Sequence, residues 1–296
     1  PENNSLVTGG MLGIKIICDM LIEKDDEVLI VGPVWPNIRS SVILRQGKVK
    51  EISLRLKNKW QLDLNELFNS ISDKTKMVFI NSPSNPTGWM LTENEQEEII
   101  AYIRKKNCWL IADEVYHQIV YDREVAPSFL QHAKPDDKLI VINSSSKSFN
   151  MTGWRIGWLS HPEFLGEHIA KLVQISTTGV PEFLQDGFFS ALINYKSIVK
   201  DVKNGLKQSR DLVFERTKNW KKIYMPETNA AFYSFFRVKD MNNSIEYAKY
   251  LIEKTQVGLA PGVAFGESGE GHLRLCFASD LNYLEQILNR LQKELS

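Results

Sequence analysis

The sequence predicts an α/β protein with a mostly parallel sheet flanked by helices, followed by a smaller α+β part. Three observations support this class. Short apolar runs alternate with helical stretches up to about Tyr195, a long charged amphipathic stretch follows, and mixed strands and helices end the chain of 296 residues. The alternation is typical of parallel sheets, because parallel strands need a crossover connection. We expect a large domain at residues 1–199 and a small domain at residues 200–296.

The elements of the large domain follow from the hydrophobic pattern. A first amphipathic helix is expected at Met11–Glu23, after paired glycines. The strands are expected at five short apolar runs: Glu27–Val31, Met77–Ile80, Trp109–Ala112, Leu139–Ile142 and Arg155–Leu159. Such runs are typical of strands that are covered on both faces. A further helix starts at Thr92, which can form a capping box with Glu95.

The rest of the chain is expected to form one long helix and the small domain. The helix, Lys200–Trp220, is charged and amphipathic and is suited to joining the two domains. Strands are expected at Ala231–Val238 and His272–Ala278, and helices at Ser244–Thr255 and Leu281–Leu295. This mixture predicts an α+β arrangement.

The composition argues against several classes of function. The 36 basic and 36 acidic residues give a formal net charge of zero, so we expect no nucleic-acid partner and no membrane surface as partner. No apolar stretch approaches membrane-spanning length. Cys18, Cys108 and Cys276 are odd in number and form no CxxC pair. This usage predicts buried free thiols in a reducing compartment, and we expect a cytoplasmic protein.

Common motifs for other chemistries are absent from the sequence. The five histidines form no close cluster, and His161 and His168 are too far apart for an HExxH site. We therefore expect no metal. No GxSxG marks a serine hydrolase. The glycines lack the spacing of the dinucleotide fingerprint GxGxxG and of the P-loop.

The segment Ser144–Trp158 contains the most informative lysine. Lys147 follows a buried strand directly, and ligands bind at the carboxyl ends of strands in open α/β sheets. Ser144 and Ser146 offer hydroxyl groups, and the guanidinium of Arg155 suits bidentate contact with phosphate oxygens. This arrangement suits a lysine that forms an imine with a phosphorylated aldehyde. By itself, the tetrapeptide Ser144–Lys147 is more typical of a polar loop with a surface lysine.

The turn after the strand Met77–Ile80 is stiff. Pro86 fixes its own backbone and forces Asn85 towards extended geometry, so the amide of Asn85 is held in place at a strand end. Such an amide is a suitable hydrogen-bonding group for a ligand. The alternative is a simple turn before the next helix.

A carboxylate and a tyrosine end another strand. Asp113 is costly to bury without a partner, and a protonated ring nitrogen would be a suitable one. Tyr116, three residues later, could reach the ring oxygen beside the imine. The alternative is that Asp113 and Glu114 mark a helix amino terminus, where negative charge is favoured.

Paired glycines precede the first expected helix. Gly9 and Gly10 would let a phosphate approach the backbone, and free N–H groups at the start of a helix bind such a group. A bare Gly-Gly is weak support by itself.

Taken in order, these motifs resemble a known family. Gly9-Gly10, Trp35, Asn85-Pro86, Asp113 with Tyr116, Lys147 and Arg155 occur in the order and context of fold-type I pyridoxal-phosphate-dependent aminotransferases. The chain is similar to the class I/II branch, the aspartate-aminotransferase-like proteins. The resemblance covers nearly the whole chain, including Ala260–Gly266 and His272–Ala278.

The resemblance implies a role for each matching residue. Lys147 would be the catalytic Schiff-base lysine, with Asp113 at the pyridine nitrogen and Tyr116 and Asn85 at the ring oxygen. Trp35 would stack on the ring of pyridoxal phosphate, and Arg274 would bind the substrate α-carboxylate beside Asn85 and Trp35. The phosphate would lie in a cup formed by Gly9, Gly10, Met11, Ser144, Ser146 and Arg155.

One departure concerns the amino terminus. Members of the family carry a sizeable segment before the Gly-Gly turn, which supplies an arm around the partner subunit and part of the active site. This chain starts at Pro1, almost on the turn. We therefore expect a homodimer whose pocket lacks that segment in the chain as given.

The expected reaction is transamination between an L-amino acid and a 2-keto acid, its small-molecule partners. Dicarboxylate-specific relatives often have a second arginine shortly after the lysine loop, but Ile175–Gln185 contains none. We therefore expect a neutral or aromatic donor. Two alternatives stay open: a carbon–sulfur β-lyase on the same fold, and a pyridoxal-phosphate-binding sensory domain without turnover.

Overall fold

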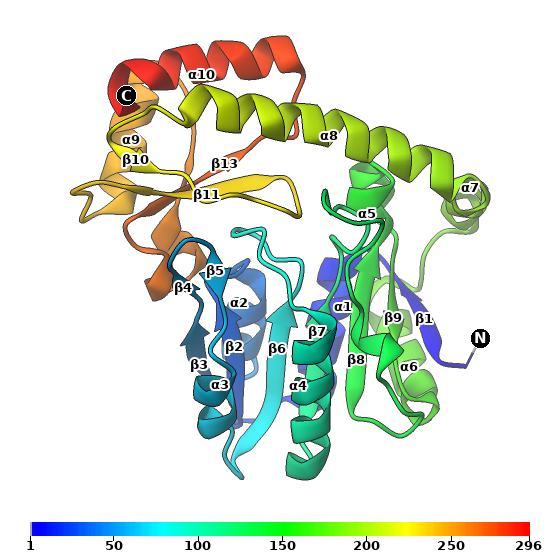
Figure 1. Cartoon of the computed structure of the whole chain (residues 1–296). Coiled ribbons are helices and arrows are strands. Elements are labelled where there is room, and N and C mark those ends of the chain that lie inside the picture. Colours follow the sequence, from blue (N-terminus) through cyan, green and yellow to red (C-terminus); the bar gives the residue numbers. More distant parts are fainter. Residues whose placement is uncertain (1) are drawn as a thin grey trace.

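The computed structural model describes residues 2–296 and has a larger sheet with a smaller sheet beside its upper end (Figure 1). The larger sheet consists of β1 (Asn4–Val7), β2 (Glu27–Gly32), β3 (Lys48–Ser53), β6 (Thr75–Asn81), β7 (Trp109–Asp113), β8 (Leu139–Ser144) and β9 (Gly157–Ser160). The smaller sheet consists of β10 (Ile223–Tyr224), β11 (Tyr233–Val238), β12 (Ala260–Pro261) and β13 (His272–Cys276). A separate two-stranded ribbon is formed by β4 (Arg55–Leu56) and β5 (Trp60–Gln61).

The larger sheet is mostly parallel, as predicted. Its strand order is β1-β9-β8-β7-β6-β2-β3. The pairs from β3 through β2, β6 and β7 to β8 are parallel, whereas β9 is antiparallel to both β8 and β1. Since β6, β7 and β8 are parallel neighbours, their last residues, Asn81, Asp113 and Ser144, lie at the same edge of the sheet.

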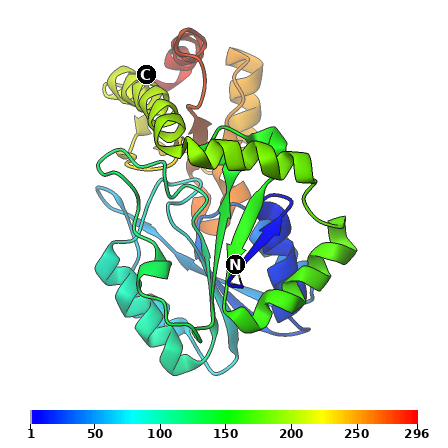
Figure 2. The same ribbon diagram turned by 90° about the vertical axis from the view of Figure 1, so that its right-hand side faces the viewer.

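Helices cover both faces of the larger sheet (Figure 2). One face packs against α1 (Gly10–Leu21), α2 (Asn37–Leu44) and α6 (Gly166–Thr177), and the other against α3 (Leu64–Ser70) and α4 (Glu93–Lys106). The predicted capping box at the start of α4 is present, because the N–H of Thr92 donates to Glu95 Oε2 at 2.7 Å and the N–H of Glu95 donates back to Thr92 Oγ1. The apolar residues of the strands alternate between these two helix layers and form the main core.

The long helix α8 (Tyr195–Thr217) runs above the larger sheet and leads from α7 (Glu182–Ile193) to the smaller sheet (Figure 1). The smaller sheet packs with α9 (Ser244–Thr255) and α10 (Leu281–Leu295), which confirms the predicted α+β arrangement. The predicted boundary between residues 199 and 200 lies within α8. The division into two domains stays a prediction.

Short helical turns connect several of these elements. They are α5 (Ser145–Ser148) and the 3₁₀ turns η1 (Phe129–Gln131), η2 (Thr152–Trp154), η3 (Glu163–Leu165), η4 (Gly262–Phe265) and η5 (Glu267–Gly269). Of these, α5 and η2 lie between the adjacent strands β8 and β9. This connection carries the lysine and the arginine that the sequence singles out.

The predicted strand Arg155–Leu159 is wrong at its start. Arg155 has φ 54° and ends the turn η2, and the strand begins only at Gly157. A left-handed residue cannot continue a pleated strand, so the chain turns at Arg155 before it enters the sheet. Strand β1 was not predicted either, because two of its four residues are exposed and it lacks a continuous apolar pattern.

The prediction of buried thiols holds for two of the three cysteines. All three are free, and Cys18 and Cys108 are buried, but Cys276 is exposed at the end of β13. The alternation of side chains along a strand places Cys276 on the face opposite to the buried Leu275. Within residues 2–296, no helix is both long and apolar enough to cross a membrane.

Candidate active site

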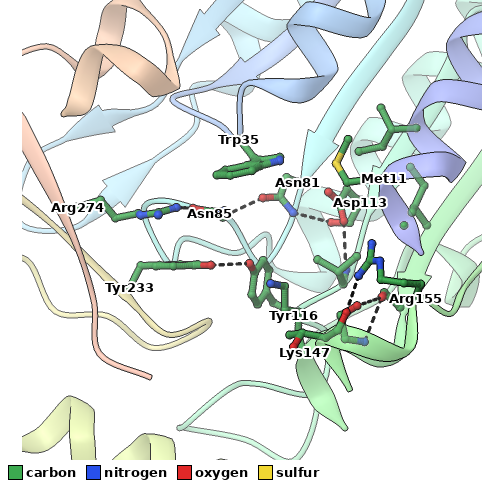
Figure 3. A pocket seen from close by; sticks show the side chains of 17 residues that line it. Met11, Trp35, Asn81, Asn85, Asp113, Tyr116, Lys147, Arg155, Tyr233 and Arg274 are labelled. Carbon is green, nitrogen blue, oxygen red and sulfur yellow. Dashed lines mark hydrogen bonds between the residues drawn. The ribbon is translucent and has the colours of Figure 1, made fainter. Parts of the chain in front are cut away.

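A pocket of about 240 Å³ opens at the carboxyl edge of the larger sheet, facing the smaller sheet (Figure 3). It collects the residues that the sequence analysis selected: Gly10, Met11, Trp35, Asn85, Asp113, Tyr116, Ser144, Ser146, Lys147, Arg155 and Arg274. Gly9 does not line the pocket but lies directly beside it, against Arg155. Residues more than 260 positions apart in the sequence therefore meet at one place.

Asp113 lies at the inner end of the pocket, where β7 ends. Its side chain accepts a hydrogen bond from the N–H of Val115 at 3.2 Å, and its backbone carbonyl accepts one from Asn81 Nδ2 at 2.9 Å. Burial raises the pKa of Asp113 to about 7, against the opposing effects of that hydrogen bond and of the positive charge of Lys147. No cation within residues 2–296 forms an ion pair with this carboxyl group, so the pocket offers it to a ligand.

The alternative interpretation of Asp113 and Glu114 as a helix amino terminus is wrong. The chain after β7 forms two turns, in which His117 N–H donates to the Glu114 carbonyl and Ile119 N–H donates to the Tyr116 carbonyl. Glu114 is buried away from the pocket and accepts hydrogen bonds from Ser128 Oγ at 2.6 Å and from the N–H of Phe129 at 2.9 Å. The two neighbouring acids therefore have different surroundings.

Lys147 lies on α5, one turn after β8, and its side chain enters the pocket beside aromatic rings. Its Nζ is 5.9 Å from the ring centre of Tyr116 and 5.5 Å from that of Phe232. Burial lowers the pKa of Lys147, and the positive charges of Arg274 and Arg155 act in the same direction. A lowered pKa increases the fraction of neutral amine, which is the nucleophilic form.

The end of the pocket near α1 is suited to an anion. Gly9 has φ 81°, and a Cβ placed there would lie 2.5 Å from Arg155 Nη2. The first N–H groups of the twelve-residue helix α1 begin at Gly10. Arg155 is held by a hydrogen bond from its Nη1 to the carbonyl of Thr152 at 2.7 Å.

Two serines complete this end of the pocket. Ser144 Oγ donates to Ser146 Oγ at 2.9 Å or to the carbonyl of Ile156 at 3.1 Å, and it accepts from the N–H of Ser146 at 3.1 Å. This small network fixes both side chains at the end of β8. The hydroxyl groups, Arg155 and the start of α1 thus form a set of hydrogen-bond donors that suits a phosphate group.

Arg274 enters the pocket from β13 of the smaller sheet. Its Nη1 donates to Asn85 Oδ1 at 2.8 Å, and its Cζ lies 4.3 Å from the ring centre of Tyr233. The rings of Phe265 and Trp35 lie 4.8 and 5.8 Å from the same atom. Its buried Nε has no hydrogen-bond partner within residues 2–296. The planar, incompletely paired guanidinium is suited to a carboxylate.

These donors and acceptors fit pyridoxal phosphate. A phosphate suits the glycine turn with Arg155 and the serines, a protonated ring nitrogen suits the buried, unpaired carboxyl group of Asp113, and an aldehyde suits the amine of Lys147. Trp35 lies 37% exposed at the mouth of the pocket, and its backbone N–H donates to the Asn85 carbonyl at 3.0 Å. An aromatic side chain at this place can cover a flat ring.

The structure adds pocket residues that the sequence analysis missed. Asn81 ends β6 and holds the loop after it, because its side chain accepts from the N–H of Asn85 at 2.8 Å and donates to the carbonyl of Asp113. A polar residue at the end of an apolar strand was a usable signal. Tyr233 and Thr152 also line the pocket. Tyr233 comes from the smaller sheet, and no local pattern marked it.

Within residues 2–296, no group of three or more histidine, cysteine, aspartate or glutamate side chains could hold a metal ion. Burial lowers the pKa of His117 to about 4. A neutral, partly buried His117 is consistent with a structural position.

Comparisons with known proteins give one family and many relatives. The family described as aminotransferase class I and II matches residues 1–291. The chain is 32% identical to the aromatic-amino-acid aminotransferase 2 of Thermococcus litoralis, over 93% of this chain and 71% of that protein. It is also 32% identical to the aspartate aminotransferase of Pyrococcus horikoshii, over 99% of this chain and 75% of that protein.

A solved structure has the same fold. The aromatic aminotransferase from Pyrococcus horikoshii superposes with a TM-score of 0.92 at 28% sequence identity, over 98% of this chain and 78% of that chain. The similarity therefore extends over the larger sheet, the long helix and the smaller sheet together.

Proposed function

The chain belongs to the class I and II aminotransferase family, and we propose from this premise that Lys147 is its catalytic residue and that its donor is a neutral or aromatic L-amino acid. The fold-type I architecture and an enzyme that transfers amino groups follow from the family and its structural neighbours. Members of the family use pyridoxal phosphate. One observation carries the proposal: a partly buried lysine, a buried carboxyl group without a cation and an arginine open into the same pocket.

Pyridoxal phosphate supplies an electrophilic aldehyde and a ring that accepts electrons from the substrate α-carbon. Lys147 would hold the cofactor covalently between reactions. Because burial lowers its pKa, the released amine of Lys147 is able to take the proton from the substrate α-carbon. The same amine would return this proton to the former aldehyde carbon of the cofactor, which keeps the amino group.

Asp113 would hold the proton on the ring nitrogen. Its buried carboxyl group has a pKa raised to about 7 while it lacks a cation, and a protonated nitrogen would supply the missing partner. Pairing with a cation favours the ionised form of a carboxyl group. Asp113 would thus keep the nitrogen charged and the ring electron-poor.

The remaining side chains would bind and orient. The turn Gly9–Met11 with Ser144, Ser146 and Arg155 would hold the phosphate, and Trp35 would cover the ring. Tyr116 and Asn85 would donate to the ring oxygen. Arg274 would bind the substrate α-carboxylate, with Asn85 and Trp35 beside it. Each assignment rests on the position of the residue in the pocket and on the chemistry of its side chain.

The choice of donor rests on what the pocket region contains. The segment Ile175–Gln185, where dicarboxylate-specific relatives often carry an arginine, has none. Aromatic rings of Trp35, Tyr233 and Phe265 surround Arg274, the proposed carboxylate site. The relatives include aromatic-amino-acid, aspartate and LL-diaminopimelate aminotransferases. These surroundings favour an apolar side chain over a second carboxylate.

A donor panel tests this choice. The values of kcat/KM are measured for phenylalanine, tyrosine, leucine, alanine and aspartate, each with 2-oxoglutarate as acceptor. We expect the aromatic or neutral donors to exceed aspartate by at least about tenfold, the ratio that corresponds to 1.4 kcal/mol. A clear preference for aspartate would overturn the proposed donor class and leave the family assignment intact.

We also propose a homodimer and a cytoplasmic location. Helix α7 exposes apolar side chains along most of its length: Phe183 and Ile193 are 71% and 67% exposed, and only Phe188 is buried. A second copy of the chain is the occupant that we propose for this face. The location rests on the three free cysteines, which suit a reducing compartment.

A further inference from the structure

Tyr233 lies at the contact between the two halves of the pocket. It is the first residue of β11 in the smaller sheet and is only 6% exposed. Its hydroxyl oxygen is 3.0 Å from the hydroxyl oxygen of Tyr116, and its ring centre is 4.3 Å from Arg274 Cζ (Figure 3). One side chain therefore contacts the proposed ring-oxygen donor and the proposed carboxylate-binding residue.

Hydrogen bonds fasten the segment just before Tyr233 to the segment that follows β7 of the larger sheet. The N–H of Ala231 donates to the carbonyl of Ile119 at 2.9 Å, and the carbonyl of Ala231 accepts from the Tyr121 hydroxyl at 2.6 Å. An isolated bridge pairs Val120 with Ala230. The segment before β11 is thus fastened to the segment after Tyr116, so the distance between the two tyrosines does not depend on their side chains alone.

The two hydroxyl groups share one hydrogen bond, in which either oxygen can be the donor. A tyrosine hydroxyl donates one proton and can accept others. Within residues 2–296, the Tyr116 and Tyr233 hydroxyl groups have only each other as hydrogen-bond partner. If Tyr233 donates to Tyr116, the proton of Tyr116 is free for an acceptor in the pocket. Burial raises the pKa of Tyr116 well above its ordinary value, so this proton is retained.

The ring of Tyr233 restrains Arg274. A guanidinium group 4.3 Å from the centre of an aromatic ring lies in cation–π contact. At the edge of the guanidinium group, Arg274 Nη1 donates a hydrogen bond to Asn85 Oδ1 at 2.8 Å. The ring contact and the hydrogen bond together limit rotation of the guanidinium plane. A carboxylate that binds through two parallel hydrogen bonds requires a fixed plane.

We propose that Tyr233 is a positioning residue that orients the proton of Tyr116 through its hydroxyl group and the guanidinium plane of Arg274 through its ring. This inference rests on the proposed function, because it assumes the roles given there to Tyr116 and Arg274. The two actions are separable: Tyr233→Phe removes the hydroxyl group and keeps the ring, and Tyr233→Leu removes both.

The first experiment follows the absorption spectrum of the chain with bound pyridoxal phosphate as a function of pH. Loss of a hydrogen bond to the anionic ring oxygen raises the proton affinity of the bound cofactor. We expect Tyr116→Phe to raise the midpoint of the spectral transition, and Tyr233→Phe to raise it in the same direction by about half a pH unit. Tyr224→Phe, in the same sheet but bonded to Lys57 and Asn58 carbonyls, is the control and leaves the midpoint unchanged.

The second experiment measures the dissociation constant of 3-phenylpropionate, a carboxylate that lacks the amino group and cannot react. We expect Tyr233→Leu to weaken this binding about tenfold, because the variant removes the cation–π interaction with Arg274. Tyr233→Phe keeps the ring and should bind within about twofold of the parent chain. A melting curve of each variant shows that it is folded.

The outcomes separate the inference from the function on which it rests. A midpoint that moves in Tyr116→Phe but not in Tyr233→Phe overturns the hydroxyl action of Tyr233. An unchanged dissociation constant in Tyr233→Leu, with binding abolished in Arg274→Ala, overturns the ring action. If Tyr116→Phe leaves the midpoint in place, the proposed role of Tyr116 is wrong, and the hydroxyl action fails with it.

Discussion

At the scale of single residues, the pocket combines groups whose charge has no protein partner. Asp113 is buried without a cation, Lys147 is partly buried beside aromatic rings, and Arg274 has a buried Nε without a hydrogen-bond partner within residues 2–296. Such groups cost stability in an empty pocket. Their joint occurrence therefore indicates a ligand that carries a cationic nitrogen, an electrophilic carbon and a carboxylate.

The pKa of Asp113 gives a test on the cofactor-free chain. Burial raises its pKa from 3.8 to about 7, so the folded chain holds a proton that the unfolded chain releases between these values. This contribution to the free energy of unfolding is therefore present at low pH and is lost as the pH rises towards 7. We expect Asp113→Asn to flatten the pH dependence by at most about 1.4 kcal/mol per pH unit, measured by urea unfolding between pH 4 and 8.

Glu114 is the matched control for that measurement, because burial also raises its pKa to about 7. Glu114→Gln should flatten the pH dependence of the free energy of unfolding over the same pH range in the cofactor-free chain. Of these two acids, Asp113 lines the pocket and Glu114 does not. Saturating pyridoxal phosphate should therefore remove the contribution of Asp113 to the pH dependence and leave that of Glu114. An equal effect of the cofactor on both variants would contradict the assignment of Asp113 to the ring nitrogen.

Arg274 gives a second test at this scale. Arg274→Ala removes the proposed carboxylate fork, and truncating one partner of a buried, hydrogen-bonded charge pair costs about 2 to 5 kcal/mol. We expect KM for the amino acid to rise at least about thirtyfold, while the dissociation constant of pyridoxal phosphate changes less than about threefold. Steady-state kinetics and a cofactor titration measure the two quantities. The reverse pattern would make Arg274 a structural residue.

At the scale of elements, the pocket depends on how closely β9 approaches the turn before α1. A Cβ added to Gly157 would lie 2.7 Å from the backbone nitrogen of Gly10 and 2.9 Å from the carbonyl oxygen of Asn143. Neither backbone atom can move without shifting a strand or the start of α1. The glycine in β9 therefore permits the proposed phosphate cup.

Gly157→Ala tests this dependence. We expect a loss of stability of about 1 to 3 kcal/mol, typical of overpacking, and a weaker binding of pyridoxal phosphate. Thermal unfolding and a cofactor titration measure the two effects. Gly205→Ala in α8 meets no atom within 4 Å and should be neutral or stabilising. Unchanged cofactor binding in Gly157→Ala would show that the cup tolerates a wider spacing.

The same elements show how far the sequence could predict the fold. The central strands β2, β6, β7 and β8 were found because both their faces are buried and their apolar runs are continuous. The strand β1 was missed, since a half-exposed antiparallel edge strand has no such run. Arg155 was placed in a strand because its φ of 54° has no signature in a sequence that runs Trp-Arg-Ile.

At the scale of the whole molecule, the pocket is a contact between two sheets that are far apart in sequence. Most of its residues follow strands of the larger sheet and could be predicted from strand ends and from the resemblance. Arg274 was reached through the resemblance alone, and Tyr233 was missed, because the approach of the smaller sheet is a tertiary property. A local pattern does not contain the distance between two sheets.

The proposed dimer belongs to this scale as well. Phe189→Asp places a charge on the exposed face of α7, where Phe189 is 63% exposed. We expect this variant to shift the chain from dimer to monomer, measured by analytical ultracentrifugation over a concentration series. Leu44→Asp in α2, at a residue that is 73% exposed, is the matched control and should leave the mass unchanged. A monomeric parent chain, or a dimeric Phe189→Asp variant, would contradict the proposed interface.

The most direct test of the central claim is a single half-reaction. The chain is loaded with pyridoxal phosphate and mixed with phenylalanine in the absence of a keto acid, and the 2-keto acid formed is quantified while the absorption spectrum is recorded. We expect about one equivalent of phenylpyruvate per chain, as a ping-pong transfer requires, with a change in the cofactor band, and none from Lys147→Ala. Repeated release of pyruvate, ammonia and a thiol from cystathionine, whose β-sulfur is the leaving group, would instead identify a carbon–sulfur β-lyase. An unaltered band with every amino acid would contradict transamination by this chain.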